Sequence, residues 1–302
     1  VKGGMMYDIN SDVSVFFNTG MVEKAPIMDN VIYFDGTVAS DPANEKFLHN
    51  EFGVNYRFGK LGINASAYNT DWQDRNLTKS VTTGQGDSGD TDVIFLTGVN
   101  QKHSGVELET NYMVNDMLDL MFVASFGNWK FDGDANGNYQ ETEYNSEGQA
   151  IGYTTTEYAY ALDGLYVGDM PQTSYVLGVT LKPIKDLRIQ AIHKMYDKNY
   201  SDWSPSAREF DGTNDDADRA QVWEAPSYNR LDLHMSYKLP KVKDLDMMLT
   251  ANIFNVLDEV YVQDAVDNSQ YNGYGSKNHL AHNAEVFLGT PRYANIGLSI
   301  GF

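Results

Sequence analysis

Apolar and polar residues alternate along the last segment of the chain, 293–302. The even-numbered positions carry apolar residues: Ala294, Ile296, Leu298, Ile300 and Phe302. The odd-numbered positions between them carry mostly small or polar residues, including Asn295 and Ser299. Side chains on a strand point alternately to opposite faces, so the pattern predicts a strand with one apolar face and one polar face. A final aromatic residue is typical of a strand that ends in the aromatic girdle of a membrane barrel.

The same two-faced pattern recurs about ten times along the chain. Clear examples are 13–17, 52–58, 61–67, 106–112, 118–126, 175–181, 187–191, 229–239 and 245–253. Each segment is long enough for a strand and has one face that could contact either lipid or a protein core. The pattern therefore predicts an all-β protein of about ten strands.

The predicted connections alternate between short and long. Short connections are expected at 8–12, 59–60, 114–117, 183–186 and 240–244, and long ones near 20–46, 75–101, 132–170, 200–225 and 257–291. A soluble sandwich or propeller would also give alternating strands, but neither predicts a long loop at every second connection. Short turns at one rim and long loops at the other are typical of outer-membrane barrels, whose turns are periplasmic and whose loops are extracellular.

Composition excludes several classes of protein. The 302 residues include no cysteine, so disulfide scaffolds and cysteine-ligated zinc sites are ruled out. A formal net charge of −20 argues against a nucleic-acid partner, because phosphate binding needs clustered Lys and Arg. Mean hydropathy is −0.44, and no stretch is apolar enough for a membrane-spanning helix. Barrel strands remain possible, since they hide their apolar residues at alternate positions.

The first residues, Val1–Tyr7, have no features of a signal peptide and look like the end of a strand. We therefore expect the chain to be a fragment of a larger protein.

Six segments, in order, resemble the C-terminal half of the barrel of TonB-dependent outer-membrane receptors. They are Val15–Gly20 with Glu23–Pro26, Asn50–Phe58, Ala65–Asp74, Ser104–Glu109, Asn252–Tyr261 and Gly289–Phe302. The resemblance implies a transmembrane antiparallel β-barrel of about 22 strands. Residues 1–302 would form about the last ten strands, and the plug domain would lie outside this chain.

The resemblance also implies a function, which is active uptake of a large or scarce nutrient such as a siderophore, vitamin, glycan or peptide. The expected partners are outer-membrane lipids, the nutrient and TonB acting through the plug, with a surface lipoprotein that covers the extracellular loops as a further candidate. A passive porin and an outer-membrane barrel hydrolase remain as alternatives. No common catalytic motif occurs in the chain, so we expect a protein that is not an enzyme.

One segment fits the template of a calcium loop. Its oxygen-bearing residues are Asp132, Asp134, Asn136, Asn138 and Glu143, with a glycine at the sixth position. The alternative is an ordinary acidic, glycine-rich turn, because strands rather than helices are expected on both sides. No other cofactor is expected. His279 and His282, in the last long connection, are a further metal hypothesis, set against ordinary loop histidines.

Aromatic residues in the long connections are the candidates for ligand binding. They are Tyr153, Tyr158, Trp203, Trp223, Tyr271 and Tyr274. Such rings can stack on sugars or hold peptides, but they can equally pack one loop against another.

Overall fold

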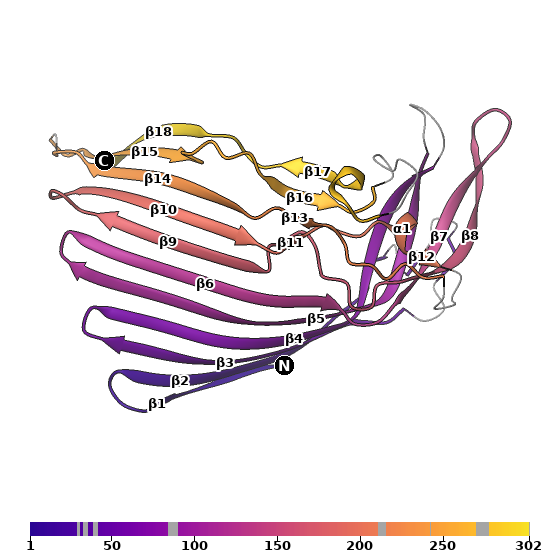
Figure 1. The fold of residues 1–302 in the computed structure, drawn as a ribbon, viewed down its shortest axis with the longest axis horizontal. Coiled ribbons are helices and arrows are strands. Elements are labelled where there is room, and N and C mark those ends of the chain that lie inside the picture. The colour runs from indigo at the N-terminus through magenta and orange to yellow at the C-terminus, as the bar shows by residue number, and fades with distance from the viewer. Residues whose placement is uncertain are drawn as a thin grey trace.

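The computed structural model describes residues 1–28, 31–32, 36–38, 42–83, 90–210, 216–241, 243–269 and 278–301. Its main feature is a curved wall of antiparallel strands (Figure 1). The strands of this wall are β1 (Lys2–Asp8), β2 (Val13–Lys24), β3 (Glu45–Phe58), β4 (Leu61–Thr83), β5 (Asp90–Asn115), β6 (Leu118–Phe131), β9 (Thr173–Leu181), β10 (Leu187–Asp197), β14 (Tyr228–Lys238), β15 (Asp246–Phe254) and β18 (Tyr293–Gly301).

The remaining elements lie in the long connections. They are β7 (Ala135–Tyr144), β8 (Ala150–Tyr160), β11 (Asn199–Tyr200), the helix α1 (Pro205–Arg208), β12 (Glu209–Phe210), β13 (Glu224–Ala225), β16 (Val262–Val266), the 3-10 helix η2 (Ala281–Asn283) and β17 (Glu285–Leu288). Within the described ranges, no helix has the length and hydrophobicity needed to cross a bilayer.

The wall strands follow one another in the order β1-β2-β3-β4-β5-β6-β9-β10-β14-β15-β18, and β1 and β18 are the edges of this path. Every pairing along it is antiparallel. The predicted antiparallel barrel wall is therefore confirmed, with strands at each position where the two-faced pattern was found.

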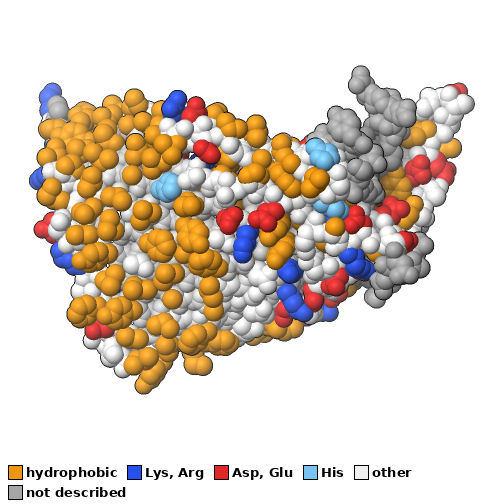
Figure 2. Space-filling model, in the orientation of Figure 1, with side chains coloured by type: hydrophobic (Ala, Val, Ile, Leu, Met, Phe, Trp, Pro, Cys, Tyr) orange, Lys and Arg blue, Asp and Glu red, His pale blue; other side chains and the backbone are white. Residues whose placement is uncertain are grey.

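Strand pairing brings the apolar positions together on one outer face. One row across β2 to β6 consists of Phe17, Phe52, Ala67, Val106 and Phe126. Phe52 is 54% exposed and Ile296 on β18 is 80% exposed, so the wall itself leaves these side chains uncovered. In Figure 2, hydrophobic side chains form a broad band between charged groups at the two ends of the wall. Such a band suits contact with lipid.

The outer face turns polar at a defined height. The next row toward the long connections consists of Thr19, Asn50, Asn69, Ser104 and Asn128. Above it, β4, β5 and β6 carry Asp71, Lys102 and Lys130 in register. Charged side chains are costly in the hydrocarbon and favourable at its interface, so these two rows mark the upper edge of the apolar band.

The inner face is polar and its side chains bond to one another across strands. On β14, β15 and β18, the Asn252 amide contacts His234 at 2.8 Å and donates to Asn295 at 2.8 Å. Asp232, which is 1% exposed, pairs with Lys194 at 2.9 Å. Satisfied polar groups of this kind are stable when they face a watery lumen, as in membrane barrels.

The connections alternate as predicted, with short turns at one rim and longer connections at the other (Figure 1). Two of the predicted long loops, however, are largely strands. Segment 75–101 is the continuation of β4 and β5, which remain paired out to Thr83 and Asp90. Segment 132–170 contains the hairpin β7–β8, which pairs with β5. Above the membrane both faces of a strand meet water or loops, so alternation no longer marks these extensions.

The long connections share a small hydrophobic core. Its buried residues are Ile94, Leu96, Val99, Phe131, Ala135, Tyr160, Leu162, Leu165, Tyr200, Trp203 and Val222. They come from β5, β6, β7, β8, the segment between β8 and β9, and the segment between β10 and β14, so the core joins distant loops into one packed unit above the wall.

Candidate functional site

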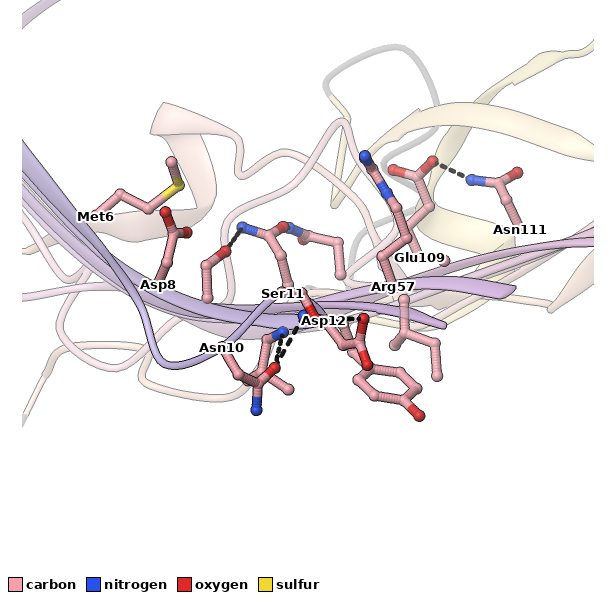
Figure 3. Close-up of a pocket in the computed structure, with 15 residues that line it drawn as sticks. Met6, Asp8, Asn10, Ser11, Asp12, Arg57, Glu109 and Asn111 are labelled. Atoms are coloured by element: carbon pink, nitrogen blue, oxygen red, sulfur yellow. Dashed lines mark hydrogen bonds between the residues drawn. The ribbon is translucent and has the colours of Figure 1, made fainter. Parts of the chain in front are cut away.

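A polar hollow of about 550 Å³ lies on the inner face beside the first short turn (Figure 3). Its walls include Asp8 and Asn10 from the turn region of β1, Arg57 from β3, and Glu109 and Asn111 from β5. The Asn111 amide donates to the Glu109 carboxylate at 2.8 Å. This hollow is on the inner face at the rim of the short turns, so molecules inside the lumen can reach it.

A second hollow, of about 370 Å³, lies on the inner face at the opposite end of the strands. Six ring-bearing residues line it, and we call them the aromatic shelf: Phe47, His49, Tyr68, Trp72, His103 and Trp129. Glu51, Thr70 and Glu107 complete its lining. The shelf spans four neighbouring strands, β3 to β6, because pairing puts these positions in adjacent rows of the same face.

Hydrogen bonds hold several rings of the shelf by their edges. The Trp129 indole donates to the Tyr68 hydroxyl at 2.9 Å, and His49 Nδ1 lies 2.8 Å from the Thr70 hydroxyl. The Trp72 indole donates to a Glu45 carboxylate oxygen at 3.3 Å. Edge bonding fixes the orientation of a ring, and in addition Arg75 lies over one face of Trp72 and His103 stacks on Trp129.

Two glycines make room for the shelf. A Cβ atom on Gly105 would lie 2.6 Å from the Tyr68 hydroxyl and 2.7 Å from the Phe126 carbonyl oxygen. A Cβ atom on Gly127 would lie 2.8 Å from the Trp129 indole. Both glycines therefore let a ring lie directly on the sheet, which allows Tyr68 to cross β5 and reach Trp129.

A buried charged network ties the last two long connections together. Arg208 and Asp267 have side chains that are 0% exposed, and the guanidinium lies 3.4 Å from the carboxylate. His279 bridges two carboxylates, with Nδ1 2.5 Å from Asp267 and Nε2 2.9 Å from Asp218. Burial alone would raise the pKa of Asp218, but hydrogen bonds from His279 and the Ala220 backbone lower it below its usual value.

His279 and His282 were a metal hypothesis, and they have different partners. His279 belongs to the buried network, whereas His282 Nε2 lies 3.0 Å from the Asn278 amide. Within the described ranges, no group of three or more His, Asp or Glu side chains is arranged to hold a metal ion.

The residues of the calcium template extend from the link between β6 and β7 into β7. Asp132 pairs with Lys102 at 2.7 Å, and Asp134 pairs with Arg219 at 2.8 Å. Asn136, Asn138 and Glu143 lie within β7, and Glu143 accepts a hydrogen bond from Thr154. Calcium binding at this segment stays a prediction. It is tested by comparing calcium-dependent thermal stabilisation of the wild type with that of Asp132→Ala combined with Glu143→Ala.

The predicted ligand-binding aromatics lie in different environments. Tyr153, on β8, is 37% exposed, and the ring centroid of Tyr158 lies 6.2 Å from that of Tyr139. Trp203 is 2% exposed, so it packs the loop core and is not open to a ligand in this conformation. Trp223 is half-buried, and its backbone donates to Asp267. Tyr271 and Tyr274 lie outside the described residues.

A second group of loop carboxylates lies close together. Asp202 pairs with Lys79, and the neighbouring Asp169 keeps contact with solvent. Partial burial of its carboxyl group, together with the charges of Asp202 and Asp264, raises the pKa of Asp169 to about 7.

Sequence reasoning missed the aromatic shelf. A usable pattern was present, since Phe47, His49, Tyr68 and Trp72 are rings on the polar phase of strands whose other phase faces lipid. Rings on the polar phase have no lipid to contact, so they indicate either internal packing or a binding surface.

The two-faced strands, the polar inner face and the two unlike rims together define the wall of an outer-membrane β-barrel. A family model described as "TonB dependent receptor-like, beta-barrel" matches residues 2–256. The chain belongs to this family, and membership implies an outer-membrane location. No curated protein matches the chain.

Solved receptors share the fold. The chain is similar to the ferric-catecholate import receptor Fiu from K12 E. coli, with a TM-score of 0.57 and 14% identity over 99% of this chain and 34% of that one. It is also similar to the copper transporter OprC, with a TM-score of 0.60 and 16% identity over 99% of this chain and 39% of that one. The siderophore receptor PiuA from Acinetobacter baumannii gives a TM-score of 0.59 and 17% identity, over 99% and 35% of the two chains. The chain thus spans little more than a third of each of these proteins.

Proposed function

We propose that this chain is the C-terminal part of the barrel of a receptor that takes up a large or scarce nutrient across the outer membrane with energy supplied through TonB. The proposal rests on the match of residues 2–256 to the family model. These residues form most of a wall whose strands have one apolar and one polar face. The polar face would line the lumen, and the plug through which TonB acts would lie against it.

The extracellular connections after Phe131, Tyr200 and Val256 are proposed to meet the nutrient or a lipoprotein partner. The first two contribute residues to the packed loop core, and the first also carries the hairpin β7–β8 (Figure 1). A packed loop unit can present a fixed surface, which lowers the entropic cost of binding a ligand.

The role is that of a receptor without covalent chemistry. A rim hydrolase would need acid, base or nucleophile side chains that converge at the rim, and alanine replacement of His279 and His282 without loss of any hydrolysis would dismiss these two candidates. A passive porin needs a lumen open to ions, which conductance across a planar bilayer would reveal.

The test is uptake by cells carrying the intact receptor gene. Deletion of the receptor and deletion of tonB are each expected to abolish accumulation of the nutrient. Uptake that persists without TonB, or a steady open-channel conductance of the purified receptor, would support the porin instead.

A further inference from the structure

We propose that the aromatic shelf binds a neutral carbohydrate, with the apolar face of a sugar ring on the aromatic rings and its hydroxyl groups bonded to Glu51, Glu107 and Thr70. This inference rests on the uptake function proposed above and deepens it by naming the class of substrate.

The position of the shelf follows from the strand register. On β4, Tyr68 lies between the outward residues Ala67 and Asn69, which belong to the last apolar row and the first polar row of the outer face. The shelf is therefore at the height where the outer face leaves the lipid, on the side of the long connections. A ligand that passes from the loops into the lumen would meet the shelf on the inner face.

The charge of the hollow selects against anions. Its lining includes the carboxylates of Glu51 and Glu107 and contains no Lys or Arg. The neighbouring Arg75 guanidinium is already occupied, because it lies 4.3 Å from the centre of the Trp72 ring and donates to Gln101 at 3.2 Å. An anionic ligand would gain no positive partner in the hollow and would be repelled by both carboxylates.

The arrangement of the rings suits a sugar better than an organic cation. A cation is best bound where several ring faces close around one point. Here the rings lie on four neighbouring strands, and His103 and Trp129 stack on each other with ring planes 24° apart and centroids 5.6 Å from each other. Extended ring faces match the flat C–H faces of linked sugar units, which is the geometry of a stacking platform.

The polar groups of the hollow match hydroxyl groups. A sugar hydroxyl donates one hydrogen bond and accepts others, so it pairs well with carboxylates, hydroxyls and neutral imidazoles. Below the shelf, the inner face continues with amides, such as Asn55 and Asn64, which bond to each other at 2.6 Å. Amides also both donate and accept, so they continue the same chemistry toward the short-turn rim.

Tryptophan fluorescence gives a direct test, because the shelf holds Trp72 and Trp129, two of the 4 tryptophans in the chain. The intact receptor in detergent would be titrated with maltohexaose, cellohexaose, xylohexaose and chitohexaose. We expect saturable quenching by at least one of them. Trp129→Ala should weaken binding at least tenfold, Trp129→Tyr should restore most of it, and the control Phe126→Leu, on the outer face of the same strand, should leave the affinity unchanged.

Three results would overturn the inference. The first is the absence of saturable quenching by any of the four oligosaccharides. The second is quenching by choline as strong as that by the best oligosaccharide, which would mean that the hollow selects positive charge. The third is an affinity unaffected by Trp129→Ala in a receptor that keeps its heat-modifiable mobility on SDS gels. If TonB-dependent uptake of another nutrient persists in these cases, only this inference fails. Loss of TonB dependence would instead refute the proposed function.

Discussion

The buried pair Arg208–Asp267 is predicted to hold the last two long connections together. Both side chains are 0% exposed and 3.4 Å apart. At that distance the attraction is about 5 kcal/mol with an effective dielectric constant of about 20, before the cost of desolvation is subtracted. Each partner has other contacts, since Asp267 also meets His279 and Arg208 also donates to the carbonyl oxygens of Asp218 and Ala220. We therefore expect a coupling energy of about 1.5–3 kcal/mol between the two side chains.

The measurement is a double-mutant cycle with Arg208→Met, Asp267→Asn and the combined variant. Hydrogen exchange of backbone amides in 198–210 and 255–269 of the intact receptor gives the free energy of local opening, which global unfolding of the wall would not report. Either single variant should lower it by about 3 kcal/mol, because each leaves a buried charge without one of its charged partners. The combined variant should lose less than the sum of the two.

An exposed pair in the last connection is the matched control. Arg292 and Asp258 are 3.6 Å apart, a distance close to that of the buried pair, but their side chains are 54% and 48% exposed. Solvent screening should reduce their coupling to about 0.5 kcal/mol or less. Equal coupling energies in the two cycles would refute the reasoning that burial, and not distance, makes the Arg208 pair strong.

Three further predictions concern the wall and the loops. Gly105→Ala should displace Tyr68 and destabilise the receptor by about 1–3 kcal/mol in thermal unfolding, whereas Gly62→Ala, where the nearest atom is 4.0 Å away, should not. Asp169→Asn should raise the free energy of local opening of the loops, measured by hydrogen exchange, by up to about 1 kcal/mol at pH 8 and by much less at pH 5. A carboxyl group whose pKa is raised by folding contributes stability at low pH, and this contribution is lost as the pH rises from the ordinary pKa of the group toward about 7. An equal effect of the substitution at both pH values would contradict this explanation. Ile296→Arg should destabilise the receptor by about 2–4 kcal/mol, because it places a charge on the face that contacts lipid. Unchanged heat-modifiable mobility on SDS gels would argue against lipid contact at Ile296.

The wall could be predicted from the sequence because lipid imposes a strict rule on it. One side of every spanning strand must be apolar, so alternation marks the strands and their register is fixed by the same faces. The rule does not apply above the membrane, so the sequence predicts a loop where β4 and β5 continue as paired strands. The residues of the calcium template likewise include part of β7, since a glycine-rich acidic motif does not exclude a strand.

The loop network could not be found from the sequence. Arg208 lies 59 residues from Asp267 and 71 from His279, and no local pattern connects them. Such contacts depend on how the connections fold over the wall, which is decided by the loop core around Trp203. The sequence alone therefore does not decide whether a loop aromatic binds a ligand or packs one loop against another. The burial of Trp203 shows that this residue packs the loops.

The two faces of the wall are under different constraints, and this bears on where specificity can reside. The outer face must match the bilayer, so Phe52, Ala67 and Val106 can change only to other apolar residues. The inner face must be hydrophilic but is otherwise free to vary, and each inner position alternates with a lipid-facing one. Tyr68 can therefore be replaced without altering Ala67 or Asn69, which set the height of the strand in the membrane. A binding surface built on the inner phase, such as the aromatic shelf, can thus be altered for another ligand while the barrel keeps its stability and its position in the membrane.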